Sequence, residues 1–187
     1  MRKIIILIII LLSLILIKFD VKSQDNFKSF GYGPLDKNFY NVRDIKYFNE
    51  KFFVLDSMHF RVLVFDENFK LIRSFGGFEN SLNTFINPSS IFVDEDYIYI
   101  GDSNKIKAFK HTGDFGGFFI ELPKMDVTSI AMDSNFNIWV TDRGDDTVKV
   151  FSIDNTLKMT IGKSGSGKKE FKTPLDISIK DDRVYVL

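Results

Sequence analysis

The chain has 187 residues, with 25 Lys+Arg balanced by 25 Asp+Glu, 44% hydrophobic and 15% aromatic residues, and no Cys. The absence of Cys excludes disulfides, a cysteine nucleophile, thiolate zinc sites and Cys-ligated iron–sulfur clusters. The hydrophobic content is sufficient for a buried core, and the balanced charge gives no field that would attract nucleic acid or an anionic membrane.

Residues 1–23 have the pattern of a targeting segment. Arg2 and Lys3 precede an almost unbroken apolar run at residues 4–17. As a helix this run would rise about 21 Å, which is short of the ~30 Å hydrocarbon core. We therefore predict a signal peptide cleaved before Gln24, with an uncleaved anchor formed by residues 4–17, and then a buried strand, as the alternatives. Both the signal peptide and the anchor place the remainder outside the cytoplasm, periplasmic or secreted, because the positive flank stays inside.

Removal of the targeting segment changes the charge balance. The remainder carries 21 basic and 24 acidic side chains, a net charge of −3. RNA or DNA recognition requires a basic face, so we predict no nucleic-acid partner.

A repeated unit occupies residues 24–187. The frame F-x-x-[VP]-x-x-I begins at Phe39, Phe85 and Phe171, and a weaker copy spans residues 125–130. The last residues of the four copies are 46, 39 and 47 residues apart: Ile45, Ile91, Ile130 and Ile177. Each copy is followed by short alternating runs separated by Asn, Asp, Gly and Ser, which predict strands and no helix. Four strands in a period of about 44 residues are typical of a β-propeller blade.

The predicted fold is therefore an all-β propeller of four-stranded antiparallel blades, of which about 3.5 are present. Naming the strands a to d, we predict 42–48, 51–55, 61–65 and 71–75 in blade one, 89–93, 97–101, 105–109 and 115–121 in blade two, 128–132, 138–141, 147–151 and 157–161 in blade three, and 175–179 and 183–187 in blade four. The blades span about 39–76, 85–121, 125–162 and 171–187. Residues 25–31 resemble a strand d without its own blade, which would close a ring that continues beyond Leu187.

The repeat resembles a known family. The frame, a strand ending in Asp and a strand of the type R-V-x-V-F are similar to the NHL repeat of six-bladed NHL-type propellers, and the similarity covers residues 25–187. Arg61 stands at the family's Arg position, where blades two and three have Lys105 and Thr147. The resemblance implies a six-bladed ring. NHL-type and related six-bladed propellers include amidating lyases with a histidine-bound metal and lactonases with a calcium ion in the central channel, so the resemblance implies a functionally diverse group.

Several polar motifs are better explained as structural than as catalytic. Asp56, Asp102 and Asp142 recur at one position of successive units, so we expect their carboxylates to accept backbone N–H groups in the b–c turns. Arg61 and Lys105 are expected to pack between neighbouring blades. The segment 162–169, GKSGSGKK, lacks the hydroxyl residue and following helix of a phosphate loop, and 133–137, DSNFN, lacks the later residues of a calcium loop. Both are predicted to be turns or loops.

The two ends of the predicted blades differ in function. The a–b and c–d turns lie at one end and the b–c and d–a loops at the other, which we call the loop face. His59 and His111 fall at opposite ends and cannot share a zinc ion, so we predict no metal, cofactor or catalytic residue here. We predict that the loop face binds a protein, peptide or glycan. Its candidate residues are His59, Arg143, Asp145, Asp146, Lys163 and Lys168. The alternative is a metal-dependent lactonase, lyase or hydrolase whose ligands lie mostly in other blades.

Overall fold

The computed structural model describes residues 39–181 and 183–187, which belong to one compact unit, Phe39–Leu187. The predicted targeting segment, 1–23, and the predicted strand at 25–31 are outside the described residues. Within the described part, no helix is long and apolar enough to cross a membrane.

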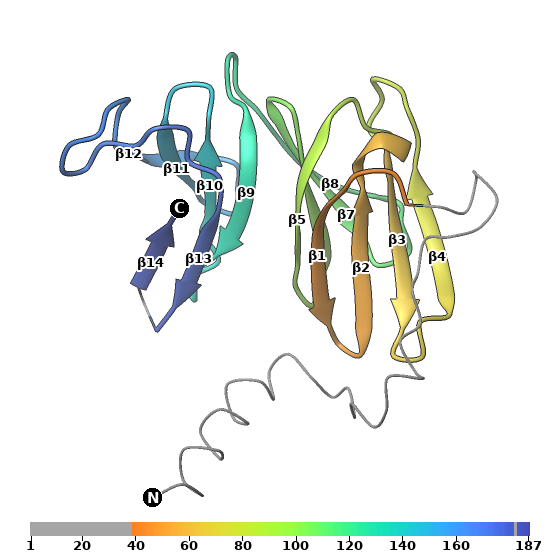
Figure 1. Ribbon diagram of the computed structural model, residues 1–187. Coiled ribbons are helices and arrows are strands. Elements are labelled where there is room, and N and C mark those ends of the chain that lie inside the picture. The colour runs from red at the N-terminus through yellow and green to blue at the C-terminus, as the bar shows by residue number, and fades with distance from the viewer. Residues whose placement is uncertain (1–38, 182) are drawn as a thin grey trace, which may run out of the picture. The chain divides into compact units, whose positions relative to one another are not determined.

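Short strands make up most of this unit (Figure 1). Sheet 1 contains β1 (Val42–Phe48), β2 (Lys51–Asp56), β3 (Arg61–Asp66) and β4 (Leu71–Gly76), with the 3-10 turn η2 (Ser57–His59) between β2 and β3. Sheet 2 contains β5 (Pro88–Val93), β6 (Tyr97–Asp102), β7 (Lys105–Lys110) and β8 (Phe115–Glu121). Sheet 3 contains β9 (Val127–Met132), β10 (Ile138–Asp142), β11 (Thr147–Phe151) and β12 (Leu157–Ile161), and sheet 4 contains β13 (Ile177–Lys180) and β14 (Arg183–Val186).

The strand prediction is confirmed. Every strand predicted within the four blades begins and ends within two residues of an observed one. Each strand pairs antiparallel with its neighbour in the chain, so the sheets are meanders of four, four, four and two strands. The alternating pattern determines the face that each residue presents, because successive side chains of a strand point to opposite sides. In sheet 1, for example, Phe53 pairs with Val64 and Leu55 with Val62 on one face.

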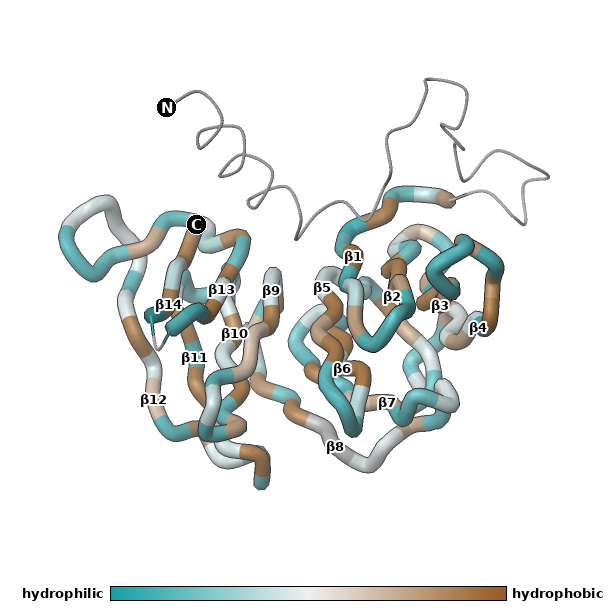
Figure 2. Tube along the Cα trace, turned by 90° about the horizontal axis from the view of Figure 1, so that it is seen from below, coloured by the Kyte–Doolittle hydropathy of each residue, from teal (hydrophilic) through white to brown (hydrophobic). Residues whose placement is uncertain are grey.

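Hydrophobic clusters fill the spaces between successive sheets. Between sheets 1 and 2, buried residues such as Phe53 and Val62 pack with Ile91 and Ile98. A second cluster joins sheets 2 and 3, and a smaller one joins Val148 of sheet 3 to sheet 4. Figure 2 shows hydrophobic residues recurring along the strands. Burial between sheets, at about 25 cal/mol per Å² of apolar surface, is the main force that holds the unit together.

The first strands of successive sheets lie against one another: β1 contacts β5, β5 contacts β9, and β9 contacts β13. One hydroxyl at each junction donates to a backbone carbonyl of the next sheet. The acceptor is always the fourth residue of the repeated frame, the Pro or Val. The three bonds are Ser57 Oγ to the Pro88 carbonyl at 2.7 Å, Ser89 Oγ to the Val127 carbonyl at 2.5 Å, and Thr128 Oγ1 to the Pro174 carbonyl at 2.7 Å.

Candidate functional site

The loop face is held together by backbone hydrogen bonds between the b–c turn of each sheet and the segment that leads into its first strand. Met58 N–H donates to the Tyr40 carbonyl at 3.0 Å in sheet 1, and Arg143 N–H donates to the Asp126 carbonyl at 2.9 Å in sheet 3. Ser103 makes the equivalent bond in sheet 2. Each of these b–c turns is therefore tied to the segment that precedes the first strand of its own sheet.

A buried Asp reinforces each of these junctions. Asp56, Asp102 and Asp142 end the second strand of their sheets and are at most 1% exposed. Oδ1 of Asp56 accepts the N–H of Tyr40 at 2.7 Å, and Oδ1 of Asp142 accepts that of Asp126 at 2.8 Å. The expected role as a backbone acceptor is therefore observed. The donors, however, come mainly from the segment before the first strand, and Asp142 alone also accepts an N–H in the b–c turn, from Gly144.

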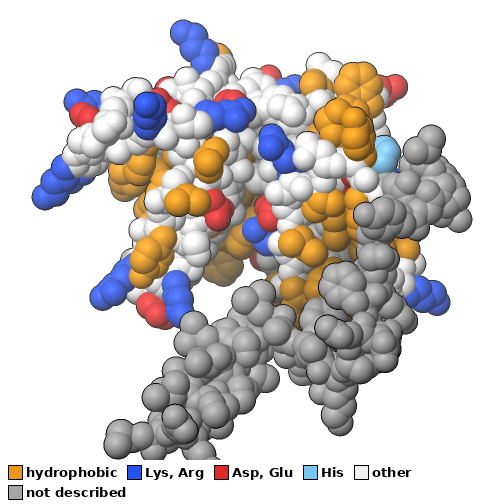
Figure 3. Space-filling model, in the orientation of Figure 1, with side chains coloured by type: hydrophobic (Ala, Val, Ile, Leu, Met, Phe, Trp, Pro, Cys, Tyr) orange, Lys and Arg blue, Asp and Glu red, His pale blue; other side chains and the backbone are white. Residues whose placement is uncertain are grey.

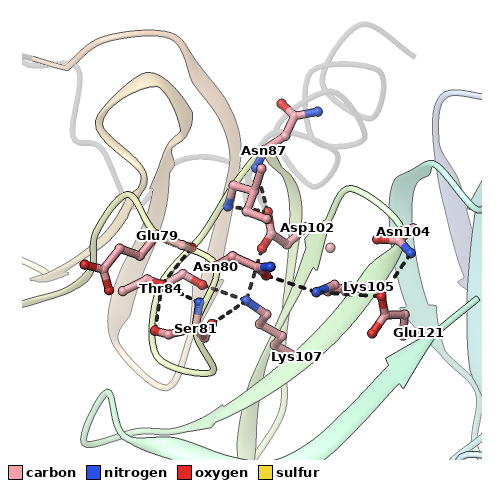
Figure 4. Close-up of polar contacts among 12 residues, drawn as sticks. Glu79, Asn80, Ser81, Thr84, Asn87, Asp102, Asn104, Lys105, Lys107 and Glu121 are labelled. Carbon is pink, nitrogen blue, oxygen red and sulfur yellow. Dashed lines mark hydrogen bonds and ion pairs between the residues drawn. The ribbon is translucent and has the colours of Figure 1, made fainter.

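A cation neutralises each of these carboxylates, and the sequence pattern singled out only one of the three. In sheet 2, Lys107 is 1% exposed and its Nζ lies 3.2 Å from Asp102 Oδ2. This contact is purely ionic, because Oδ2 accepts no hydrogen bond from the described residues. Lys107 instead donates to the carbonyls of Ser81 at 2.9 Å and Thr84 at 2.7 Å, as Figure 4 shows.

The position of the cation shifts along the third strand. Sheet 1 uses Arg61, the first residue of β3, whose Nε donates to Asp56 Oδ2 at 2.9 Å. Sheets 2 and 3 use the third residue, Lys107 or Lys149, and Lys149 Nζ lies 2.5 Å from Asp142 Oδ2. A displacement of two residues keeps the side chain on the same face of the strand. Lys105, the equivalent of Arg61, contacts Glu121 at 3.7 Å instead.

Two of the predicted binding residues at the b–c turns are engaged with neighbouring carboxylates. His59 Nδ1 lies 2.8 Å from Asp56 Oδ2, and its ring is 5.7 Å from that of Tyr40. Arg143 makes a two-nitrogen contact with Asp126, with its Nε and Nη2 at 2.8 and 2.7 Å from Oδ2. Both side chains remain partly accessible, at 30% and 41%.

The predicted acidic residues Asp145 and Asp146 also have intramolecular partners. Asp145 accepts hydrogen bonds from Lys149 at 2.7 and 2.8 Å. Burial raises the pKa of Asp145, but the bonds from Lys149 and Thr147 outweigh this and hold the pKa below its usual value. Asp146 accepts from Ser164 Oγ at 2.7 Å, which fastens the following loop to this turn.

The predicted basic residues lie in the glycine-rich loop, which encloses one of its own carboxylates. Gly167 N–H donates to Glu170 Oε2 at 2.8 Å, and Lys163 Nζ lies 3.1 Å from Glu170 Oε1. A Cβ at Gly165 would overlap Glu170 Oε2, so the space inside the loop is filled. This agrees with the interpretation as an inter-blade loop, and it leaves Lys168 exposed at the rim.

The loop face of sheets 1 and 2 also carries a group of apolar side chains that the sequence pattern did not single out. We call Tyr40, Met58, Phe78 and Ile86 the apolar patch; they are 57%, 45%, 67% and 38% exposed. Met58 is bonded to Tyr40 through the backbone, and Phe78 forms a bridge with Phe85, the neighbour of Ile86. Figure 3 shows hydrophobic side chains gathered over the loops at the upper right.

The described residues do not contain a group of three or more His, Asp or Glu side chains placed to hold a metal ion. Asp133, in the segment that resembles a calcium loop, instead organises a turn. Its Oδ1 accepts the N–H groups of Asn135 and Asn137, both at 2.9 Å, and its Oδ2 accepts Trp139 Nε1 at 2.9 Å. Burial raises the pKa of Asp133, but these bonds outweigh burial and lower it.

Solved structures similar to this chain identify its architecture. A streptogramin B lyase aligns with a TM-score of 0.61 at 16% identity, over 78% of this chain and 47% of that one. A Bacteroides fragilis protein described as exported aligns with a TM-score of 0.64 at 17% identity, over 84% of this chain and 48% of that one. The chain has a β-propeller fold. Sheets 1 to 4 are therefore propeller blades.

The similarity of this propeller to known proteins is confined to the fold. The hydrazine synthase of Kuenenia stuttgartiensis aligns with a TM-score of 0.56 at 11% identity, over 71% of this chain and 36% of that one. The chain spans about half or less of the length of these structures. No family model matches the sequence. No curated protein matches it either. At these identities the similarity establishes the fold and leaves activity open.

Proposed function

We propose that this propeller binds a protein or peptide segment that presents apolar side chains to the apolar patch. The observation that carries the proposal is the patch itself: four large apolar side chains, each at least 38% exposed, in the loop-face segments of blades 1 and 2. Large apolar side chains that are exposed together on one face and rimmed by polar residues are typical of interaction sites. The surrounding loops are already tied to the blades by the buried Asp residues, so little ordering would oppose binding.

The chemistry of the patch favours a peptide over a glycan. Met58, Phe78 and Ile86 offer no hydrogen-bonding side-chain group, and His59, which follows Met58 in the chain, already contacts Asp56. A sugar would lose water from many hydroxyl groups without finding partners, which costs free energy for each unpaired group. Apolar side chains carry no such penalty. The partly accessible His59 and Arg143 would then serve as a polar rim.

We further propose that the propeller belongs to the NHL type, forms part of a six-bladed ring and acts outside the cytoplasm. The repeated frame with its Asp-terminated strand supports the first point. Residues 1–23 support the last, as does the similarity to a Bacteroides fragilis protein described as exported. Mass spectrometry of the protein from fractionated cells tests the location: we expect a periplasmic or secreted form that starts at Gln24. A cytoplasmic protein that retains its first residues would contradict export.

Selection of a displayed random-peptide library on the full chain tests the binding function. We expect enriched peptides to carry aromatic or aliphatic residues and to lose binding to Phe78→Ser. The matched control is Phe136→Ser, because Phe136 is equally exposed, at 65% against 67%, but lies in an a–b turn at the opposite end. Peptides that bind both variants equally, or binding confined to a glycan array, would refute the proposal.

A further inference from the structure

A cavity lies at the opposite end from the loop face, between blades 1 and 2. It is partly open to solvent and has a volume of about 720 Å³, within the ~300–1,000 Å³ that small-molecule sites usually have. Its apolar lining comes from blade 1: Phe48, Phe53, Val64 and Ile72. Phe53 and Val64 are 1% and 4% exposed and belong to the core cluster between the blades. The cavity therefore has a rigid apolar floor.

The polar lining contains a cation without a counter-ion. Arg73 is partly buried, and its Nη1 donates to the His111 carbonyl at 2.6 Å, which fixes the guanidinium in place. No ion pair joins Arg73 to any described residue, and its remaining N–H donors have no protein acceptor there. A partly buried charge is costly unless it is paired. An anion inside the cavity would supply the missing partner.

His111, the residue that holds Arg73, is itself fixed in place. The His111 ring stacks on Phe48 at 6.3 Å and meets Phe53 edge-on at 5.9 Å, while its Nε2 donates to the Asp94 carbonyl at 2.9 Å. Lys51 adds a second positive charge to the lining, and Glu95, which is exposed, contributes the one carboxylate. The charge of the lining therefore favours a ligand with a single negative charge.

We propose that this cavity binds a small amphiphilic carboxylate, with its apolar body against Phe53 and Val64 and its carboxylate on the guanidinium of Arg73. A planar guanidinium suits this role because two of its N–H groups can donate to the two oxygens of one carboxylate. The site is independent of the loop face, which lies at the other end of the same strands.

The test is calorimetric titration of the full chain with 8-phenyloctanoate, 8-phenyloctanol and 8-phenyloctylamine, which share a body and differ in charge. We expect the carboxylate to bind at least about tenfold more tightly than the alcohol or the amine, the effect of one charge-assisted contact. Arg73→Gln should abolish this preference. Arg43→Gln, at an exposed position of β1 outside the cavity, should retain it.

A second pair of variants guards against a folding defect. Ile72 is 47% exposed, so Ile72→Glu should fold and should weaken carboxylate binding by placing a negative charge in the lining. Leu71→Glu adds the same charge one residue away, at a 50% exposed position that does not line the cavity, and should bind normally. Phe78→Ser, on the loop face, should also bind normally. The proposal is wrong if the three compounds bind equally or not at all, or if Arg73→Gln and Arg43→Gln behave alike.

Discussion

The buried ion pair between Lys107 and Asp102 makes a quantitative prediction about stability. Replacing Lys107 with Met keeps the apolar stem in place and removes the ammonium group. Asp102, which is fully buried, then loses its only ionic partner among the described residues, and the carbonyls of Ser81 and Thr84 lose a donor. Loss of one member of a buried pair costs about 3–5 kcal/mol, because the remaining charge stays in a medium of low polarity.

The matched control is Lys105→Met, two residues earlier on the same strand. Lys105 is 16% exposed and lies 3.7 Å from Glu121, whose side chain is 45% exposed. Solvent screens such a pair, so its loss should cost about 0–1 kcal/mol. In urea unfolding followed by circular dichroism, we expect Lys107→Met to lower the midpoint strongly without changing the slope. For a chain of this size the melting temperature should fall by about 6–20 °C, against at most ~4 °C for the control.

A double variant tests the cause of this loss. Asp102→Asn retains an oxygen that can accept the N–H groups of Ile86 and Asn87, and it removes the negative charge. Lys107→Met combined with Asp102→Asn should therefore be more stable than Lys107→Met by itself. If the double variant is no more stable, or if Lys107→Met is as stable as Lys105→Met, the reasoning is wrong, because an uncompensated charge on Asp102 would then not be the cause of the lost stability.

Three further outcomes are expected from the blades and their turns. The pKa of Asp133 is lowered in the folded state, so its carboxylate stabilises the fold above the ordinary carboxyl pKa, and this stabilisation is lost as the pH falls through the lowered pKa. The difference in stability between the wild type and Asp133→Asn should therefore be constant near neutral pH and narrow as the pH falls below about 4. Gly76→Ala should cost more than about 1 kcal/mol in thermal unfolding, because φ is +110° and the new Cβ would lie 2.5 Å from a backbone oxygen. Gly117→Ala, with φ +90° and nothing within 4 Å, should cost less, and equal losses would show that steric contact is unimportant. Asp146→Ala should release the loop that precedes β13 and speed its cleavage by trypsin, whereas Asp154→Ala, in a different turn, should leave the cleavage rate unchanged.

The strands were predictable because they depend on short-range patterns. Alternation over four to six residues determines which side of a strand is buried, and the repeated frame gives the start of each blade. The turn at Asp133 was equally accessible, since an Asp followed by Asn residues bonds its own backbone. These features need no knowledge of what packs against them.

The buried cations and the apolar patch were not predicted, because they depend on contacts between distant segments. Lys107 and Lys149 occupy the third position of KIKAF and TVKVF, where alternation would place a side chain on a buried face. A Lys at a position that alternation predicts to be buried would therefore have identified both residues from the sequence. Phe78 and Tyr40 lie outside the repeated frame's fixed positions, and only the folding of the d–a loop beside the b–c turn brings them together.

The hydroxyl contacts between successive sheets bear on how such a chain can diversify. Ser57, Ser89 and Thr128 each donate to a main-chain carbonyl, an acceptor that every amino acid possesses. The carboxylate of each Asp, by contrast, finds its backbone donors within its own unit. A duplicated or recombined unit would thus bring its own buried ion pair, and these hydroxyl contacts would require from its neighbour only a backbone in the right place. Gene duplication could therefore lengthen this array and keep the hydroxyl contacts unchanged, whereas the hydrophobic clusters between sheets and the bond from Ser129 Oγ to Asp176 would still need matched side chains.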